Sequence, residues 1–283
     1  MFSYAGARVW VTTSRSAVKA RAWRRDPRAA GMVRGGDESV VFTGRVRRHD
    51  ALDPETWASS IAHAPAAALA TLRFTKKNAR FFAGYAVDAR QIPLAWTPPG
   101  RVFVSIGIER VALVGAEGVR SRDGAWGSGV ESRESFRARR STDPLRGLPS
   151  DVAAGVGRGG RGALAVETAR GPVVLDVSWV AEEAGLFAAL PEDAWALAAA
   201  GPDPGVALVA DHASAWRARE MVGAMVQGTA AAFAVARLSS GRGSAGARAA
   251  AAGVEPDGAV VLGIVPRRLV WWRGWDSGTV VPS

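Results

Sequence analysis

A hydroxyl-rich segment near the start of the chain has the residue types of a phosphate-binding site. Residues 10–21 carry four hydroxyl side chains, on Thr12, Thr13, Ser14 and Ser16. Lys19 follows them, where the sequence favours a helix. The unpaired N–H groups at a helix start attract an anion, and a lysine ammonium can close over it as a point charge. The segment therefore predicts a site for a phosphate monoester. A well-capped basic surface helix is the alternative that these residues leave open.

The neighbouring residues predict the strand and the helix that would position this segment. Residues 8–13 alternate β-forming side chains, so they predict a strand that ends at the hydroxyl residues. Ser16 is a suitable cap for a helix over residues 17–25. That helix should end at Asp26, because a residue that precedes proline disfavours the α conformation. Further strands are expected over residues 29–33, 40–46 and 101–114, and a second helix over residues 53–72.

Composition predicts two β-rich domains. Residues 119–162 are dominated by Gly, Arg, Ser and Asp, which is typical of a linker. The expected domains are therefore residues 1–118 and residues 163–283. The second domain should begin with a hairpin of residues 164–168 and 173–179, which are separated by Gly and Pro.

The two halves also share a sequence pattern. The run from Val104 to Arg110 matches the run from Val261 to Arg267, and both lie near the end of their half. This match indicates a divergent internal duplication. Chance recurrence of strand and turn signals in a β-rich chain is the alternative.

The chain is strongly basic, with a formal net charge of +10 at pH 7 over 283 residues. Only three of its 36 basic residues are lysines, at positions 19, 76 and 77. The arginines are scattered, with the densest group over residues 133–146, and they do not alternate with aromatic residues as in single-strand binders. Nucleic-acid binding is therefore a minor hypothesis, and one of the few lysines marks the predicted phosphate site.

Several classes of protein are excluded by what the sequence lacks. It has no cysteine, so disulfides, thiolate metal sites and a cysteine nucleophile are excluded. Its three histidines fit no paired-ligand motif, and we expect no metal site. Its apolar runs are far shorter than the roughly 20 residues that span a bilayer, and no export signal begins the chain. We expect a cytoplasmic protein without a membrane segment.

The first half resembles the pyridoxamine 5'-phosphate oxidase-like split-barrel family through the run VWVTTSRSAVKARAWRRDPRAAGMV and then SVVFTGRVR. The resemblance covers residues 8–46. The second half is similar to the C-terminal domain of tandem members through SAWRAREMVGAMVQG and RRLVWWRGWDSGTV, which is a less specific match. The family implies a mainly β (α+β) fold of tandem split β-barrels with short flanking helices.

The resemblance also implies a cofactor and its position. Family members bind flavin mononucleotide (FMN), or in some branches a deazaflavin, at an interface between two subunits. Four residues of this chain match those that meet the phosphate: Thr12, Thr13, Ser16 and Lys19. A tandem chain would place both barrels of the usual dimer in one molecule as a pseudo-dimer, which could itself form a homodimer.

This sequence departs from the family at its start. Members normally have a helix and two strands before the strand that residues 8–13 represent. The N-terminal barrel is therefore expected to be truncated, with that strand left as an edge or covered by another part of the chain.

Two further groups are candidates for contact with a cofactor. Trp271 and Trp272 could stack on a flavin ring, although aromatic residues that close a barrel core are the alternative. Arg217 and Arg219 alternate along their segment and could reach an anion.

Three functions follow from these observations. The first is an FMN- or deazaflavin-dependent oxidoreductase with a small-molecule substrate, in which the cofactor carries the redox chemistry. The second is a non-catalytic carrier or sensor that binds a flavin, a haem or a related ring. The third is a nucleic-acid-binding scaffold that uses residues 133–146.

Overall fold

A computed structural model describes residues 1–50, 52–88, 100–127, 143–183, 185–212, 217–234 and 258–282. These residues divide into two compact units that alternate along the sequence. The first unit takes its residues from 1–29, 43–109 and 214–220, and the second from 30–42, 110–213 and 221–283. The predicted domain limits at residues 118 and 163 stay a prediction. Most of the predicted nucleic-acid segment, residues 133–146, lies outside the described residues.

The first sheet has six strands in the order β1-β2-β5-β4-β3, with β6 paired to β5. Its strands are β1 (Ser3–Ala5), β2 (Arg8–Ser14), β3 (Arg28–Gly35), β4 (Glu38–His49), β5 (Arg101–Gly115) and β6 (Gly118–Asp123). β2 pairs antiparallel with β5 along its whole length, from Arg8 opposite Gly107 to Ser14 opposite Arg101. Antiparallel register places residues that face each other across the ladder on the same face of the sheet.

The expectation that β2 lacks a preceding partner is wrong for its first half. Ser3 to Ala5 pair with Arg8 to Trp10, so a short hairpin at the start of the chain supplies a strand. The indole N–H of Trp10 donates to the carbonyl of Ala5 at 2.9 Å, which ties the hairpin together. Composition did not reveal this strand because it has only three residues, fewer than a periodicity argument can use.

Helices of the first unit are short: α1 (Val18–Arg25), α2 (Trp57–Ala62), α3 (Ala64–Lys77) and α4 (Ala79–Val87), with 3-10 turns at Pro54–Thr56 and Ala218–Glu220. The single helix predicted over residues 53–72 is therefore divided near His63. Pro65 lies in the first turn of α3, where its missing N–H is tolerated but would interrupt a continuous helix. No helix of the described residues has the length and apolar content that a membrane crossing requires.

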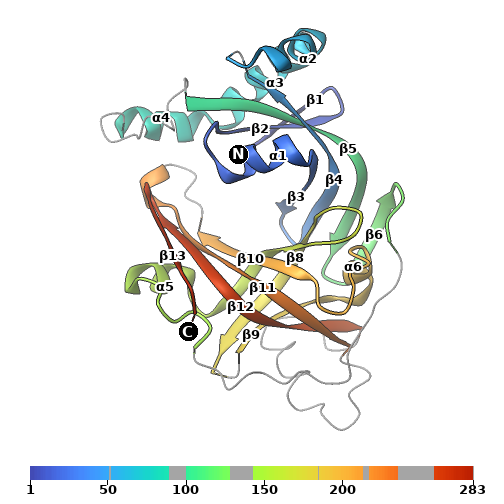
Figure 1. Cartoon of the computed structure of the whole chain (residues 1–283), viewed down its shortest axis with the longest axis vertical. Helices are drawn as coiled ribbons and strands as arrows, with labels where there is room; N and C mark the ends of the chain where they lie inside the picture. The colour runs from blue at the N-terminus through green and yellow to red at the C-terminus, as the bar shows by residue number, and fades with distance from the viewer. Residues whose placement is uncertain are drawn as a thin grey trace. The chain divides into compact units, whose positions relative to one another are not determined.

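The second sheet closes into a six-stranded antiparallel barrel. Its order is β11-β10-β7-β8-β9-β12, and β11 pairs with β12 to complete the circle, while β13 adds to β12. Figure 1 shows its long crossing strands in yellow to red. The strands are β7 (Gly159–Val166), β8 (Val173–Glu182), β9 (Gly185–Pro191), β10 (Gly205–His212), β11 (Val222–Ala234), β12 (Ala259–Arg273) and β13 (Asp276–Val280). Two short helices, α5 (Ser150–Val156) and α6 (Glu192–Ala196), accompany them.

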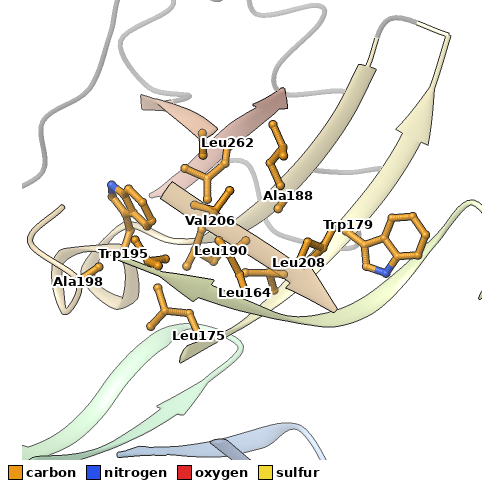
Figure 2. Close-up of a cluster of buried hydrophobic side chains, with 14 of the residues drawn as sticks. Leu164, Leu175, Trp179, Ala188, Leu190, Trp195, Ala198, Val206, Leu208 and Leu262 are labelled. Carbon is orange, nitrogen blue, oxygen red and sulfur yellow. The ribbon is translucent and has the colours of Figure 1, made fainter. Parts of the chain in front are cut away.

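The expected fold class is confirmed: the protein is mainly β, with one closed barrel, a second sheet and few short helices. The predicted hairpin is also present, as β7 and β8, with Val166 opposite Val173. Along β8 buried and half-buried residues alternate strictly, because successive side chains of a strand point to opposite faces. Figure 2 shows side chains from β7, β8, β9, β10, β12 and α6 gathered in the resulting core.

In each sheet a glycine lies at a very close approach of two strands. A Cβ added to Gly44 would lie 1.9 Å from the carbonyl oxygen of Gly107. A Cβ added to Gly228 would lie 2.0 Å from the carbonyl oxygen of Val265. In both cases the neighbouring strand, β5 or β12, contains the sequence run that matches between the two halves. The recurrence is what an internal duplication would produce.

Candidate functional site

The connection between β2 and α1 contains the predicted hydroxyl cluster. The Ser14 and Ser16 hydroxyl oxygens are 2.9 Å apart, and the Ser16 backbone N–H donates to Ser14 Oγ at 3.3 Å. Ser16 was expected to cap the helix, which is wrong, because Ala17 is the N-cap and no side chain caps α1. The short turn directs the Ser16 hydroxyl back to Ser14. The helix start therefore keeps N–H groups that no side-chain cap uses.

Arg101, at the start of β5, lies against the end of β2. Its guanidinium donates to Thr12 Oγ1 at 2.6 and 3.1 Å and to the Thr12 carbonyl at 3.0 Å. The antiparallel register brings this arginine to the hydroxyl turn, because it pairs directly with Ser14. Sequence reasoning missed Arg101, since a pairing register across 87 positions leaves no local signal.

Lys19, in α1, is influenced by burial and by the positive charge of Arg101. Desolvation and the charge of Arg101 lower the pKa of Lys19 from its ordinary value of 10.5, although the residue keeps an exposed surface. No carboxylate of the described residues forms an ion pair with Lys19. Arg15, by contrast, is bound to the buried Asp50 at 2.6 and 2.8 Å. Lys19 is therefore the cation of this turn that an external anion can engage.

The residues predicted to bind a phosphate do not all lie on the same face of β2. Thr12 and Ser14 alternate with Thr13, which is 3% exposed and therefore buried on the opposite face of β2. The structure thus brings together Thr12, Ser14, Ser16 and Lys19 and adds Arg101. Thr13 would serve the site only through its backbone.

Arg217 and Arg219 face a carboxylate of the chain itself. Arg217 Nη2 lies 2.5 Å from Asp88 Oδ1, and Arg219 Nε lies 3.8 Å from the same oxygen. Asp88 ends α4 and is buried. Its hydrogen bond to Arg217 lowers the pKa of Asp88 below the ordinary value. These arginines hold a 3-10 turn to a helix end, so their charge is already partly compensated.

Trp271 and Trp272 lie on β12 in the second unit and point to opposite faces of the barrel wall. The Trp271 indole covers Gly278 of β13, and the Trp272 indole covers Gly223 of β11. Each ring fills the space that a glycine leaves on the neighbouring strand. The two indoles are half-buried, and alternation prevents them from forming one common wall for a ring.

A basic cluster that the sequence did not indicate lies on the first sheet. Its members are Arg8 on β2, Arg47 and His49 on β4, and His63 at the α2–α3 junction. The His49 and His63 rings are 5.8 Å apart, and Arg47 Nη1 is 3.5 Å from His63 Nε2. Arg8 Nη1 is buried and has no hydrogen-bond partner among the described residues. A search for short motifs could not find this cluster, because its residues are far apart in the sequence and only strand pairing and helix packing bring them together.

Burial and neighbouring positive charges lower the pKa values of two members of this cluster, His49 and Arg8. Burial and then the charges of His63, Arg8 and Arg47 lower the pKa of His49 to about 4. His49 is therefore neutral at pH 7, stacked 5.0 Å from Trp10, with Nε2 2.9 Å from the Ser105 hydroxyl. Burial and Arg47 also lower the pKa of Arg8. Within the described residues, no group of three or more His, Asp or Glu side chains is arranged to hold a metal ion.

Comparison with known proteins gives distant similarities only. No family model matches the chain, and no curated protein matches it. Among solved structures, it is similar to a heme binding protein from Mycobacterium smegmatis, with 19% identity over 46% of this chain and 55% of that chain and a TM-score of 0.34. The chain thus matches about half the length of that protein. A second solved structure is 17% identical, over 50% of this chain and 96% of its own, with a TM-score of 0.34. Similarity at this level indicates neither a ligand nor an activity, so the geometry of the sites carries the functional argument.

Proposed function

We propose that the turn between β2 and α1 binds the phosphate of a flavin-type cofactor, FMN or a deazaflavin. The observation that carries this proposal is that Arg101 is bound to Thr12 near the paired hydroxyl groups of Ser14 and Ser16, and that its charge lowers the pKa of Lys19. A phosphate would relieve the repulsion between the cations. It would also accept hydrogen bonds from the hydroxyl groups and from the uncapped N–H groups of α1.

The donor set fits a phosphate monoester in its chemistry. Phosphate oxygens accept hydrogen bonds only, and this turn offers an ammonium, hydroxyl groups and backbone N–H groups as donors. The cations are of two kinds, since Arg101 is fixed by Thr12 while Lys19 is exposed and can adjust its position.

The proposed activity is that of an oxidoreductase acting on a small molecule. A bound flavin or deazaflavin would supply the redox chemistry, and the protein would supply its anchoring and orientation. The resemblance of residues 8–46 to the pyridoxamine 5'-phosphate oxidase-like family supports this choice of cofactor.

Two measurements test binding and activity separately. Full-length protein is titrated with FMN, with a deazaflavin and with riboflavin, which lacks the phosphate, and bound ligand is followed by fluorescence. The proposal requires binding of a phosphorylated ring and weaker binding of riboflavin. Consumption of the reduced cofactor with candidate oxidants then tests catalysis. Binding without turnover would support a carrier or sensor instead, and failure to bind either phosphorylated ring would overturn the proposed site.

Replacing Lys19 with alanine is expected to weaken cofactor binding. The loss of one charge-assisted hydrogen bond costs about 1.5–3 kcal/mol, which corresponds to roughly a ten- to hundredfold increase in Kd. Riboflavin affinity should change little, because its ring carries no phosphate. The dissociation constants are measured by fluorescence titration at one ionic strength.

Lys76→Ala is the matched control for this experiment. Lys76 is an exposed lysine in the last turn of α3, and its removal lowers the net charge by the same amount. Equal weakening by both variants would indicate a general charge effect. Unchanged FMN affinity in Lys19→Ala would place the phosphate elsewhere.

A further inference from the structure

The second unit contains a cavity of about 770 Å³ that is distinct from the proposed phosphate site. Its wall comes from the turns and strand ends of β3–β4 and β5–β6, from β7 and β8, and from the junction of β9 with α6. All of the residues that line it belong to this one unit. A volume of this size is within the range of small-molecule sites, about 300–1,000 Å³.

The charge of the cavity is opposite to that of the protein. It is lined by five carboxylates, on Asp37, Glu117, Asp176, Glu192 and Asp193, and by Arg161 as its one basic residue. Asp176 is already neutralised, since it binds Arg34 and Arg161 at 2.6 Å each. The other four have no ion pair with the described residues, although the chain has ten more basic than acidic residues.

One of these carboxylates is held in place by the backbone. Asp193 Oδ2 accepts a hydrogen bond from the Val119 N–H at 2.8 Å, which fixes the start of α6 beside the β5–β6 turn. Four carboxylates without an ion pair among the described residues thus line one cavity of a chain whose net charge is positive.

Ser39 provides an independent sign of a ligand. It lies on β4, lines the cavity and is 2% exposed, and its hydroxyl oxygen has no hydrogen-bond partner among the described residues. An unsatisfied buried hydroxyl costs free energy, so native structures retain few of them. A donor on a bound molecule would satisfy this oxygen.

We propose that this cavity binds an organic cation with two or more ammonium groups, of the aliphatic polyamine class. The carboxylates would hold the charged nitrogens, and Ser39 would accept a hydrogen bond from one of them. Apolar side chains of Ala116 and Pro191, which line the same wall and are not buried, would contact the methylene segments. A bare metal ion fits less well, because the described carboxylates do not form a group that could coordinate one. The cavity proposal does not depend on the flavin proposal.

The direct test is calorimetric titration of the full-length protein with spermidine at 50 and 300 mM NaCl. Binding with about 1:1 stoichiometry that weakens with salt is the expected result. Removing two charges in Glu117→Gln/Glu192→Gln should raise the spermidine Kd about tenfold, the upper range for two partly exposed charge pairs. The control Glu55→Gln/Asp123→Asn removes the same charge away from the cavity and should retain the wild-type Kd. Equal weakening in both double variants, or no binding at millimolar spermidine, would overturn the proposal.

Ser39→Ala separates a ligand-binding hydroxyl from a structural one. Removing an unsatisfied buried oxygen should raise the Tm of the ligand-free protein, by about 2–4 °C for a gain typical of one such group. The same variant should bind spermidine several-fold more weakly. An unchanged spermidine Kd, or binding of Mg²⁺ in place of spermidine, would show that the cavity does not use this hydroxyl for an organic cation.

Discussion

Gly228→Ala is expected to destabilise the barrel by about 3 kcal/mol or more, which is at the upper end for added bulk in a well-packed site. The added Cβ would lie 2.0 Å from the Val265 carbonyl oxygen, 2.9 Å from its carbonyl carbon and 3.3 Å from Pro266 Cα. All three atoms are backbone, so no side-chain rotation can relieve the contact. The register between β11 and β12 shifts at this same glycine.

The consequence is large because this pairing closes the barrel. β11 and β12 are the two strands whose contact turns the second sheet into a closed one. Displacing β11 to accommodate a methyl group would separate backbone hydrogen bonds on both sides of the irregularity. Stability is measured by urea denaturation followed by tryptophan fluorescence.

Gly201→Ala is the matched control, since no atom lies within 4 Å of a Cβ added there. It should change the free energy of unfolding by less than about 0.5 kcal/mol, as surface substitutions usually do. If Gly228→Ala behaved like Gly201→Ala, the close approach of β11 and β12 would not exist in solution.

The second large effect is a loss of stability in mild acid that depends on His49. The pKa of His49 is about 4 in the folded protein, against an ordinary value of 6.5. Between these values the unfolded chain binds a proton that the folded chain does not. The free energy of unfolding therefore falls as the pH drops from about 6.5 to about 4, by up to about 3 kcal/mol, and levels off below that range.

The carboxylates of Asp26, Asp50, Asp88 and Asp143, whose pKa values are lowered in the folded protein, act mainly below this pH window. Arg28 lowers the pKa of Asp26 below 3.8, Arg15 does the same for Asp50, and Arg217 for Asp88. The stability that these carboxylates contribute is therefore lost only in stronger acid.

The variant that tests this effect is His49→Gln, which has no titrating ring but can still hydrogen-bond the Ser105 hydroxyl. Its free energy of unfolding should be lower at pH 7, because the stacking on Trp10 is lost. The decrease between pH 6.5 and 4.5 should be smaller than in the wild type. His212→Gln alters an exposed histidine and should leave the wild-type slope. A slope that persists in His49→Gln would assign the effect to another group.

The class of fold and much of the local structure follow from signals in the sequence alone. Strict alternation in β8, the turn between β7 and β8, and proline after Asp26 are local signals with a local physical cause. They predicted a mainly β protein, and the structure confirms it. The hydroxyl residues before α1 were equally visible, because a strand, a turn and a helix start are adjacent in the chain.

The contacts between distant side chains depend on long-range folding. The guanidinium of Arg101 donates to Thr12, and the rings of His49 and His63 lie near each other, although these residues are distant in the sequence. No short sequence pattern encodes the strand pairing and helix packing that bring them together. Long-range packing likewise joined Arg217 to Asp88. The separation of Thr12 from Thr13, and of Trp271 from Trp272, follows instead from the alternation of side chains along a strand, which is a local property of the sequence. Barrel closure between β11 and β12 likewise depends on a register set across many residues, with Gly228 at its closest point. Residue types can be read from a sequence, whereas a binding site requires distances, and those are fixed by long-range pairing.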